Sequence, residues 1–333
     1  MVVIDGAAGY VPLYRIDRAD IVEQHGGRGR GESAVPARDE NHVTMASEAA
    51  ETALARSDID AAELGGVFAA SITDFYAEHG IAAQVAYRLG ATGDVRTADF
   101  QATARASGDA LALAREFVRS TDRPALVTAA DVMPVEPGHD EEASVGAGAG
   151  AVVLCPDGDA PTARLDGVGQ ETTGFVERHR KHDGATQQGD GRFERRHGVT
   201  PAAEAAVSRA LEAGGNEPAS AVASAPGYRL AQAALSSVDA EAVSTFNDVG
   251  YAGAATLLLD LAHALESTDT GESVLAVAYG QGGADAFALT VDGGVAADIG
   301  MTVADQIDAK EYVPYAKHLA YRENYDYRGV PSP

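Results

Sequence analysis

Cysteine, lysine and tryptophan are nearly missing from this sequence of 333 residues. The single cysteine, Cys155, excludes a disulfide within the chain and any zinc site built from several cysteines. No run of about eighteen apolar residues occurs, and the N-terminus reads as a first strand rather than a signal segment. We therefore expect a cytoplasmic protein that does not span a membrane.

Positive charge is also scarce. The chain has 25 basic residues, of which three are lysines, against 50 acidic residues, and its net charge is −25 at pH 7. Such a surface is typical of adaptation to high salt, where counterions screen the repulsion between acids. It argues against nucleic acid as a partner. The hydrophobic content of 45% is that of an ordinary globular chain.

Helical patterns alternate with strand-like apolar runs, which predicts an α/β architecture with largely buried sheets. We expect helices over 44–56, 78–89, 105–119, 201–213, 251–266 and 302–322. We expect strands over 65–71, 94–100, 125–130, 147–154, 220–225, 273–279 and 285–291. Residues 131–144, which are acidic and contain proline, are predicted to form an exposed loop.

The order of these elements recurs about 150 residues later. Helix 44–56 corresponds to 201–213, strand 65–71 to 220–225, helix 105–119 to 251–266, and strand 125–130 to 273–279. A duplicated α/β half is the simplest explanation, and a chance match of alternating elements is the alternative. We predict an N-terminal half over 1–158, a C-terminal half over 159–300, and a helix and tail over 301–333. Helices 105–119 and 251–266 should pack together between two sheets.

Four short motifs resemble the thiolase superfamily, and in particular archaeal-type 3-hydroxy-3-methylglutaryl-CoA (HMG-CoA) synthases, in order and spacing. They are Gly9-Tyr10-Val11-Pro12 with Tyr14-Arg15-Ile16, Asp39-Glu40 with Val43-Thr44-Met45-Ala46, Ala98-Asp99-Phe100, and Gly280 to Phe287. The resemblance implies a five-layered αβαβα sandwich of two pseudo-duplicated halves, normally a homodimer. It also implies a family activity that condenses acetyl-CoA with acetoacetyl-CoA.

The family's reaction requires a nucleophilic cysteine at a helix N-terminus, a glutamate base and a histidine. By the resemblance, these three positions fall on Ala104, Ile72 and Ser224. The asparagine of a fourth motif falls near Asp248-Val249-Gly250-Tyr251, two residues from Asn247. Alanine cannot carry an acyl group, so we expect that the usual condensation does not occur by the usual route.

Residues 177–197 form a basic island, with six of the twenty-five bases. Coenzyme A carries a 3′-phosphate and a diphosphate, and the island could bind them. The candidate residues are Arg178, Arg180, Lys181, Arg192, Arg195 and Arg196. Salt bridges to the acidic surface are the competing interpretation. His179 and His182 have metal-ligand spacing but no third ligand nearby, so we predict no metal site.

We therefore expect a non-catalytic or regulatory subunit of HMG-CoA synthase type, related to acyl-CoA metabolism. The first alternative is a cysteine-independent acyl-CoA lyase or aldolase, because some thiolase-like proteins cleave carbon–carbon bonds with tyrosines. Tyr76, Tyr228 and Tyr251 lie close in sequence to the expected glutamate, histidine and asparagine positions, respectively. The second alternative is a synthase-like acyltransferase whose catalytic residues are displaced.

Five of the twelve tyrosines lie in the C-terminal segment: Tyr312, Tyr315, Tyr321, Tyr325 and Tyr327. Tyrosine buries a large area at low entropic cost and is enriched at interfaces. The segment is predicted to dock a partner, either a zinc-ribbon/OB-fold protein, as the resemblance implies, or another thiolase-like chain. Packing on the protein's own core is the alternative.

Overall fold

Ten strands form one continuous sheet in the order β12-β11-β13-β14-β8-β1-β7-β6-β4-β5. The computed structural model describes residues 1–74, 78–157, 161–181, 186–296 and 298–322. One arm of the sheet contains β1 (Val2–Tyr10), β7 (Ala147–Pro156), β6 (Ala125–Val132), β4 (Gly66–Ala70) and β5 (Arg96–Phe100). The other contains β8 (Ala163–Thr172), β14 (Gly283–Val291), β13 (Ser273–Gly280), β11 (Ser220–Ser224) and β12 (Glu241–Ala242).

The two arms repeat the same strand order. Counted from the junction, β1-β7-β6-β4-β5 matches β8-β14-β13-β11-β12, and this match confirms the prediction of two pseudo-duplicated halves. We predicted two separate sheets, but the two arms form one continuous sheet. They are joined where β1 and β8 pair through Val3↔Arg164 and Ile4↔Ala163. Strand β8 was not predicted, because its outer positions are half-buried or exposed and two glycines interrupt its apolar pattern.

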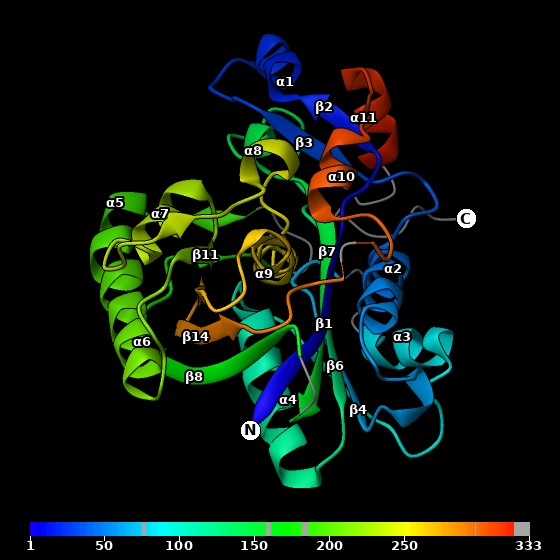
Figure 1. The fold of residues 1–333 in the computed structure, drawn as a ribbon. Helices are drawn as coiled ribbons and strands as arrows, with labels where there is room; N and C mark the ends of the chain where they lie inside the picture. Colours follow the sequence, from blue (N-terminus) through cyan, green and yellow to red (C-terminus); the bar gives the residue numbers. More distant parts are fainter. Residues whose placement is uncertain (75–77, 158–160, 182–185, 297, 323–333) are drawn as a thin grey trace.

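Helices fill the space between the arms and cover both outer faces (Figure 1). The central layer contains α4 (Ala106–Thr121) and α9 (Ala255–Ser267), as expected for the two middle helices. One outer layer contains α2 (His42–Ala55) and α3 (Ile81–Leu89), and the other contains α6 (Thr200–Glu212) and α7 (Tyr228–Ala234). The predicted αβαβα sandwich is therefore confirmed.

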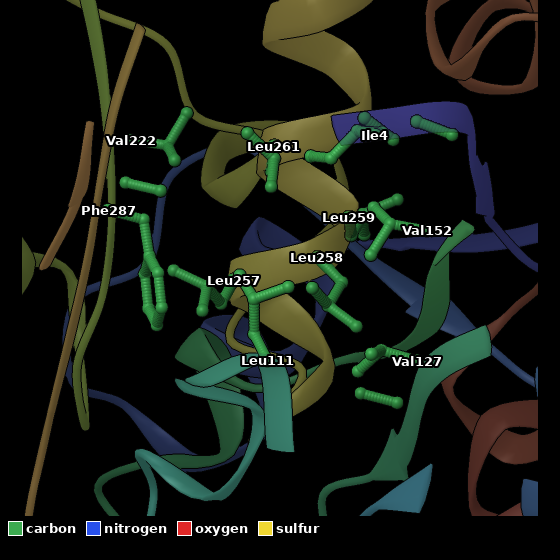
Figure 2. Packing of buried hydrophobic residues seen from close by; sticks show 14 of the residues in the cluster. Ile4, Leu111, Val127, Val152, Val222, Leu257, Leu258, Leu259, Leu261 and Phe287 are labelled. Carbon is green, nitrogen blue, oxygen red and sulfur yellow. The ribbon is translucent and has the colours of Figure 1, made fainter. Parts of the chain in front are cut away.

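The helix α9 is apolar around most of its circumference because it packs on both arms. Figure 2 shows Leu257, Leu258 and Leu259 of α9 between Val222 and Phe287 of one arm and Val127 and Val152 of the other. Each fully buried leucine side chain contributes about 1.5–3 kcal/mol relative to an exposed one. This layer is the rigid support from which the loops at the ends of the strands project.

The C-terminal segment differs from the single helix predicted over 302–322. It forms α10 (Val303–Asp308), β15 (Glu311–Tyr312) and α11 (Tyr315–Arg322). Pro314 explains the break, because a proline disfavours helical conformation in the residue before it. The strand β15 completes a small sheet with β2 (Tyr14–Asp17) and β3 (Glu32–Val35), next to α1 (Arg18–His25).

The prediction of an exposed loop over 131–144 is wrong for its first residues. Asp131 is fully buried, and Met133 and Val135 are 8% exposed. The strand β6 continues to Val132, which carries this stretch into the interior. Within the described ranges, no helix is long and apolar enough to cross a membrane.

Candidate functional site

Ile72, Ala104 and Ser224, where the resemblance places the family's catalytic residues, lie at or just after the carboxyl ends of strands that are parallel within each arm of the sheet. Strand β4 is parallel to β5 and β6, and β11 is parallel to β13. Ile72 follows β4, Ala104 follows β5, and Ser224 is the last residue of β11. Ligands of α/β proteins bind beyond the carboxyl ends of such strands.

Ala104 lies in a tight turn between β5 and the start of α4. The turn contains Ala102, whose φ of 74° lies in the left-handed region that non-glycine residues rarely adopt. Ala104 is 2% exposed, and its N–H donates to Oε1 of Gln281 at 3.1 Å. Gly280 lies against the turn so closely that a Cβ there would be 2.6 Å from the backbone nitrogen of Arg105. The turn carries only a methyl group at the position where the resemblance places the nucleophile.

Arg105, the next residue, anchors the start of α4 to the other half of the protein. Its Nη1 atom is 3.1 Å from both carboxylate oxygens of Asp285 in β14, and its Nη2 is 3.4 Å from Asp109. Asp285 is fully buried, and its burial raises the pKa of the carboxyl to about 7 although the Arg105 guanidinium acts in the opposite direction. The ion pair fixes the position of the turn relative to β14.

Ile72, at the position where the resemblance places a general base, is a packed hydrophobic side chain. It contacts the cluster formed by Met133, Val135, Val145 and Tyr251. A carboxylate placed there would be desolvated, whereas the isoleucine stabilises the cluster. The position expected for a general base is therefore apolar.

Asp131, at the carboxyl end of β6, is the central polar residue of the site, and sequence reasoning missed it. Its Oδ1 accepts from Ser71 Oγ at 2.7 Å, Ile72 N at 2.9 Å, Thr73 N at 3.0 Å and Thr73 Oγ1, and its Oδ2 accepts from Ala254 N at 2.7 Å. Burial raises the pKa of Asp131 to about 6, while these hydrogen bonds oppose the rise. Asp131 thus joins the loop after β4 to the start of α9. The sequence signal that could have identified Asp131 is an acidic residue near the end of a long apolar strand.

His42 is the histidine nearest to Asp131. Its Nε2 lies 2.8 Å from Thr73 Oγ1 and 3.9 Å from the carboxylate of Asp131. Burial lowers the pKa of His42 to about 4, so the ring is neutral near pH 7. Among the residues that the structure describes, no group of three or more histidine, cysteine or acidic side chains could hold a metal ion.

Ser224 points into the central layer. Along β11, Val222 belongs to the central core and Ala223 to the outer core, so alternation places Ser224 on the inner side. Its side chain is fully buried, and its hydroxyl has no hydrogen-bond partner in the described part of the chain. The position expected for the histidine therefore carries a buried hydroxyl that faces the central helices.

Two of the three tyrosines considered for a lyase lie near each other. Tyr251 is 4% exposed and packs with Phe246, and Tyr228 stacks on the same ring at a centroid distance of 5.0 Å. The Tyr251 hydroxyl has no partner among the described residues, and burial raises its pKa well above the usual value. The positive charge of Arg178 acts in the opposite direction and lowers the pKa of Tyr251. Tyr76 lies outside the described residues.

The basic island divides into an inner and an outer part. Arg178 is 7% exposed and forms an ion pair with Glu141, and Arg180 donates from Nη2 to the carbonyl oxygen of Ile72 at 3.0 Å. Lys181, Arg192, Arg195 and Arg196 are exposed, and none of these four forms an ion pair within the described ranges. Only the outer four present free cationic groups to solvent.

The described tyrosines of the C-terminal segment have different environments. Tyr315 donates to Glu142 at 2.9 Å, and Tyr321 packs on Tyr14 with ring centroids 5.7 Å apart. Tyr312 is 59% exposed and donates to Glu32, which also binds Lys310. Tyr325 and Tyr327 lie outside the described residues.

The sandwich of two duplicated halves, with a glycine-backed turn at the start of the central helix, defines a thiolase-superfamily fold. No family model matches the chain. Curated relatives are hydroxymethylglutaryl-CoA synthases. The one from Thermococcus gammatolerans is 29% identical over 344 residues, covering 97% of this chain and 96% of the relative, and the one from Methanocaldococcus jannaschii is 27% identical, covering 96% and 98%. The protein is thus an HMG-CoA synthase-like protein of thiolase fold.

Solved structures agree with this fold. The HMG synthase of the curacin biosynthetic pathway has a TM-score of 0.82 at 18% identity, covering 97% of this chain and 88% of that one. An HMG-CoA synthase complexed with CoA has a TM-score of 0.80 at 15% identity, covering 96% and 89%. The 3-oxoacyl-[acyl-carrier-protein] synthase III of Aquifex aeolicus has a TM-score of 0.75 at 20% identity, covering 87% and 100%. At these identities the likeness establishes the fold.

Proposed function

We propose that this protein is a non-catalytic or regulatory thiolase-fold subunit of HMG-CoA synthase type, related to acyl-CoA metabolism. The observation that carries the proposal is the buried methyl group of Ala104 in the turn before α4. A thiolate at that place would be favoured by the helix dipole, and a methyl group cannot form an acyl-enzyme. Ile72 and Ser224 support the proposal, because nucleophile, base and histidine act as a unit.

We expect incubation with radiolabelled acetyl-CoA in molar KCl to leave no covalent label on the protein. The reason is that Ala104 offers no nucleophile and Cys155 is buried, with its pKa raised to about 12. Peptide mapping after the incubation measures the outcome. The variant Ala104→Cys should be acylated slowly at most, because the base and the histidine remain absent. Label on Thr103, Ser107 or Cys155 would overturn the proposal and favour a synthase-like acyltransferase with displaced residues.

We propose that coenzyme A thioesters bind even though acyl transfer does not occur. The phosphates would contact the exposed Lys181, Arg192, Arg195 and Arg196, because Arg178 and Arg180 already have partners within the chain. Exposed cationic groups that form no ion pair within the described residues are rare positive sites on a chain of net charge −25. Calorimetric titration with acetyl-CoA tests this binding separately from labelling.

The lyase is the second candidate, and Tyr251 is the observation that favours it. A buried hydroxyl without a partner, close to the charge of Arg178, is a candidate acid or base for carbon–carbon cleavage. If acyl-CoA cleavage is detected, Tyr251→Phe should abolish it while the protein stays folded.

We propose a homodimer and a docked second polypeptide, a zinc-ribbon/OB-fold protein or a thiolase-like chain. Among the described residues, strand β5 pairs with β4 only, which leaves an edge for a second copy. The exposed Tyr312 supports docking at the C-terminal segment. A neighbour of similar fold, the curacin HMG synthase, was solved in complex with an apo donor-ACP.

We expect Tyr312→Ala to weaken binding of a zinc-ribbon/OB-fold partner without a change in stability, because the ring is largely exposed. The matched variant Tyr315→Ala should lower the free energy of unfolding by about 1–3 kcal/mol, because its hydroxyl binds the buried Glu142. Co-purification of the two proteins and thermal melts measure the two effects. Equal partner binding by Tyr312→Ala and the parent would contradict docking at this residue.

A further inference from the structure

We infer that residues 141–146 couple the C-terminal helix α11 to Tyr251, so that a polypeptide docked on α11 changes the environment of this candidate acid or base. This connecting segment contains the single-turn helix η2 (Glu142–Ser144). Successive residues of the segment contact α11 on one side and Tyr251 or its neighbours on the other. The inference rests on the proposed docking at the C-terminal segment and adds how that docking acts on the site.

Glu142 is the main contact of the connecting segment with α11. Its side chain is buried, and its Oε1 atom accepts from the Tyr315 hydroxyl at 2.9 Å. His318, further along α11, places its Nε2 atom 3.9 Å from the same oxygen. The Tyr315 hydroxyl also lies 2.7 Å from Nε2 of His25 in α1, and Ala143 packs against the cluster that Tyr315 covers. A movement of α11 therefore acts directly on the connecting segment.

The other end of the connecting segment holds the backbone of Tyr251. The Tyr251 N–H donates to the Ser144 carbonyl oxygen at 2.9 Å, and the Gly146 N–H donates to the Tyr251 carbonyl oxygen at 3.0 Å. Val145, between these two contacts, packs with Tyr251 in one buried cluster. Tyr251 cannot keep its position if residues 144–146 are displaced, because both of its backbone polar groups bind them.

Glu141 links the connecting segment to the charge beside Tyr251. Arg178 donates to both oxygens of the Glu141 carboxylate, from Nη1 to Oε1 and from Nη2 to Oε2 at 3.1 Å. Burial raises the pKa of Tyr251, the charge of Arg178 opposes that rise, and the charge of Glu141 adds to it. A displacement of Glu141 would therefore change how readily the Tyr251 hydroxyl gives up its proton.

The connecting segment has little stability of its own, so its contacts decide its position. Helix η2 is a single 3₁₀ turn, in which the Ser144 N–H donates to the Glu141 carbonyl oxygen at 2.9 Å and Ala143 has non-helical φ and ψ of −84° and 24°. Such short turns are weak when isolated. Loss of the Tyr315 contact should therefore loosen the segment at Tyr251 as well. Because coupling between two sites is reciprocal, a change at Arg178 should likewise loosen α11.

Hydrogen exchange of backbone amides tests the coupling in the full chain, without a partner or coenzyme A. Tyr315→Phe keeps the ring and removes the hydroxyl that binds Glu142. We expect exchange at the Tyr251 and Gly146 amides to accelerate at least about 5-fold, the lower end of the usual range for coupled sites. Tyr321→Phe is the matched control, because it removes a hydroxyl from the same helix at a ring that packs on Tyr14. It should change both amides by less than about 2-fold.

The reverse direction starts at the site. Glu141→Gln weakens the ion pair with Arg178, and we expect it to accelerate exchange at the His318 amide of α11 at least about 5-fold. Arg180→Ala is the control, because this neighbouring arginine donates to the Ile72 carbonyl oxygen instead. It should change the His318 amide by less than about 2-fold.

The inference requires acceleration in both directions. Acceleration at the near end only, or equal acceleration by the two controls, would overturn it and leave a local role in stability. Amides of the central strands β6 and β13 report global unfolding, and an equal acceleration there would overturn the inference as well. Failure of a zinc-ribbon/OB-fold protein to co-purify would instead count against the proposed docking, because the exchange measurements use the chain alone.

Discussion

The variant Asp131→Ala should lose about 3–5 kcal/mol of unfolding free energy, because five buried donors lose their acceptor at once. Two of these donors are the hydroxyls of Ser71 and Thr73, and the others are backbone N–H groups, including that of Ala254 at the start of α9. Ser71 and Thr73 are buried beside Asp131, so their hydroxyls have no ready access to solvent. The loop after β4 and the start of α9 should therefore loosen together.

Chemical denaturation in molar KCl measures this loss, and Asp131→Asn is the matched control. The asparagine keeps one acceptor oxygen but turns a donor toward one of the five groups, so we expect an intermediate loss of about 1–3 kcal/mol. A loss below about 1 kcal/mol for Asp131→Ala would contradict the assignment of Asp131 as the structural centre of the site.

The same residue gives stability a defined pH dependence. Burial raises the pKa of Asp131 to about 6 in the folded protein, whereas an aspartate in the unfolded chain titrates near 4. Between these values the native state binds a proton more tightly than the unfolded state, so stability increases as the pH falls from about 6 to about 4. Asp131→Asn should remove this part of the pH dependence and leave the rest of the curve unchanged.

The sandwich could be predicted because its elements recur in order. Strands such as 125–130 and 273–279 are continuous apolar runs, since helices cover both their faces, and such runs are easily read. Strand β8 was missed because only one of its faces is fully buried and two glycines interrupt its pattern. The C-terminal segment was predicted as one helix, and Pro314 was the sequence signal for the break that the structure shows.

For the candidate site, the sequence could place residues on the fold but could not reveal their partners. Ala104, Ile72 and Ser224 could be placed because each follows a recognisable strand. Asp131 and Gln281 could not be assigned roles, because their partners lie about 60 and 177 residues away in the sequence. The sequence also gives the number of charged residues but does not show which of them form ion pairs. The basic island therefore looked uniform, although Arg178 is buried against Glu141 and Arg192 is exposed.

Buried arginines without acidic partners make the surface more negative than the composition suggests. Arg56 with Glu266 and Arg178 with Glu141 form largely buried pairs, which leave the net charge of the surface unchanged. Arg15 and Arg18 are almost fully buried and bind mainly backbone carbonyl oxygens, so two positive charges are withdrawn from the surface without neutralising any acid. The exposed shell is therefore dominated by acids that have no basic neighbour.

We expect the folded protein to lose its stability when KCl falls from molar concentration to below about 0.5 M, because the repulsion between surface acids is then less screened. Thermal melts across a KCl series measure the effect. Sucrose, which strengthens burial without screening charge, should not replace the salt. The triple variant Glu48→Gln, Glu51→Gln and Asp58→Asn removes three exposed acids and should need less KCl to stay folded. A melting temperature independent of KCl would contradict adaptation to high salt, and equal rescue by sucrose would assign the effect to burial and not to charge.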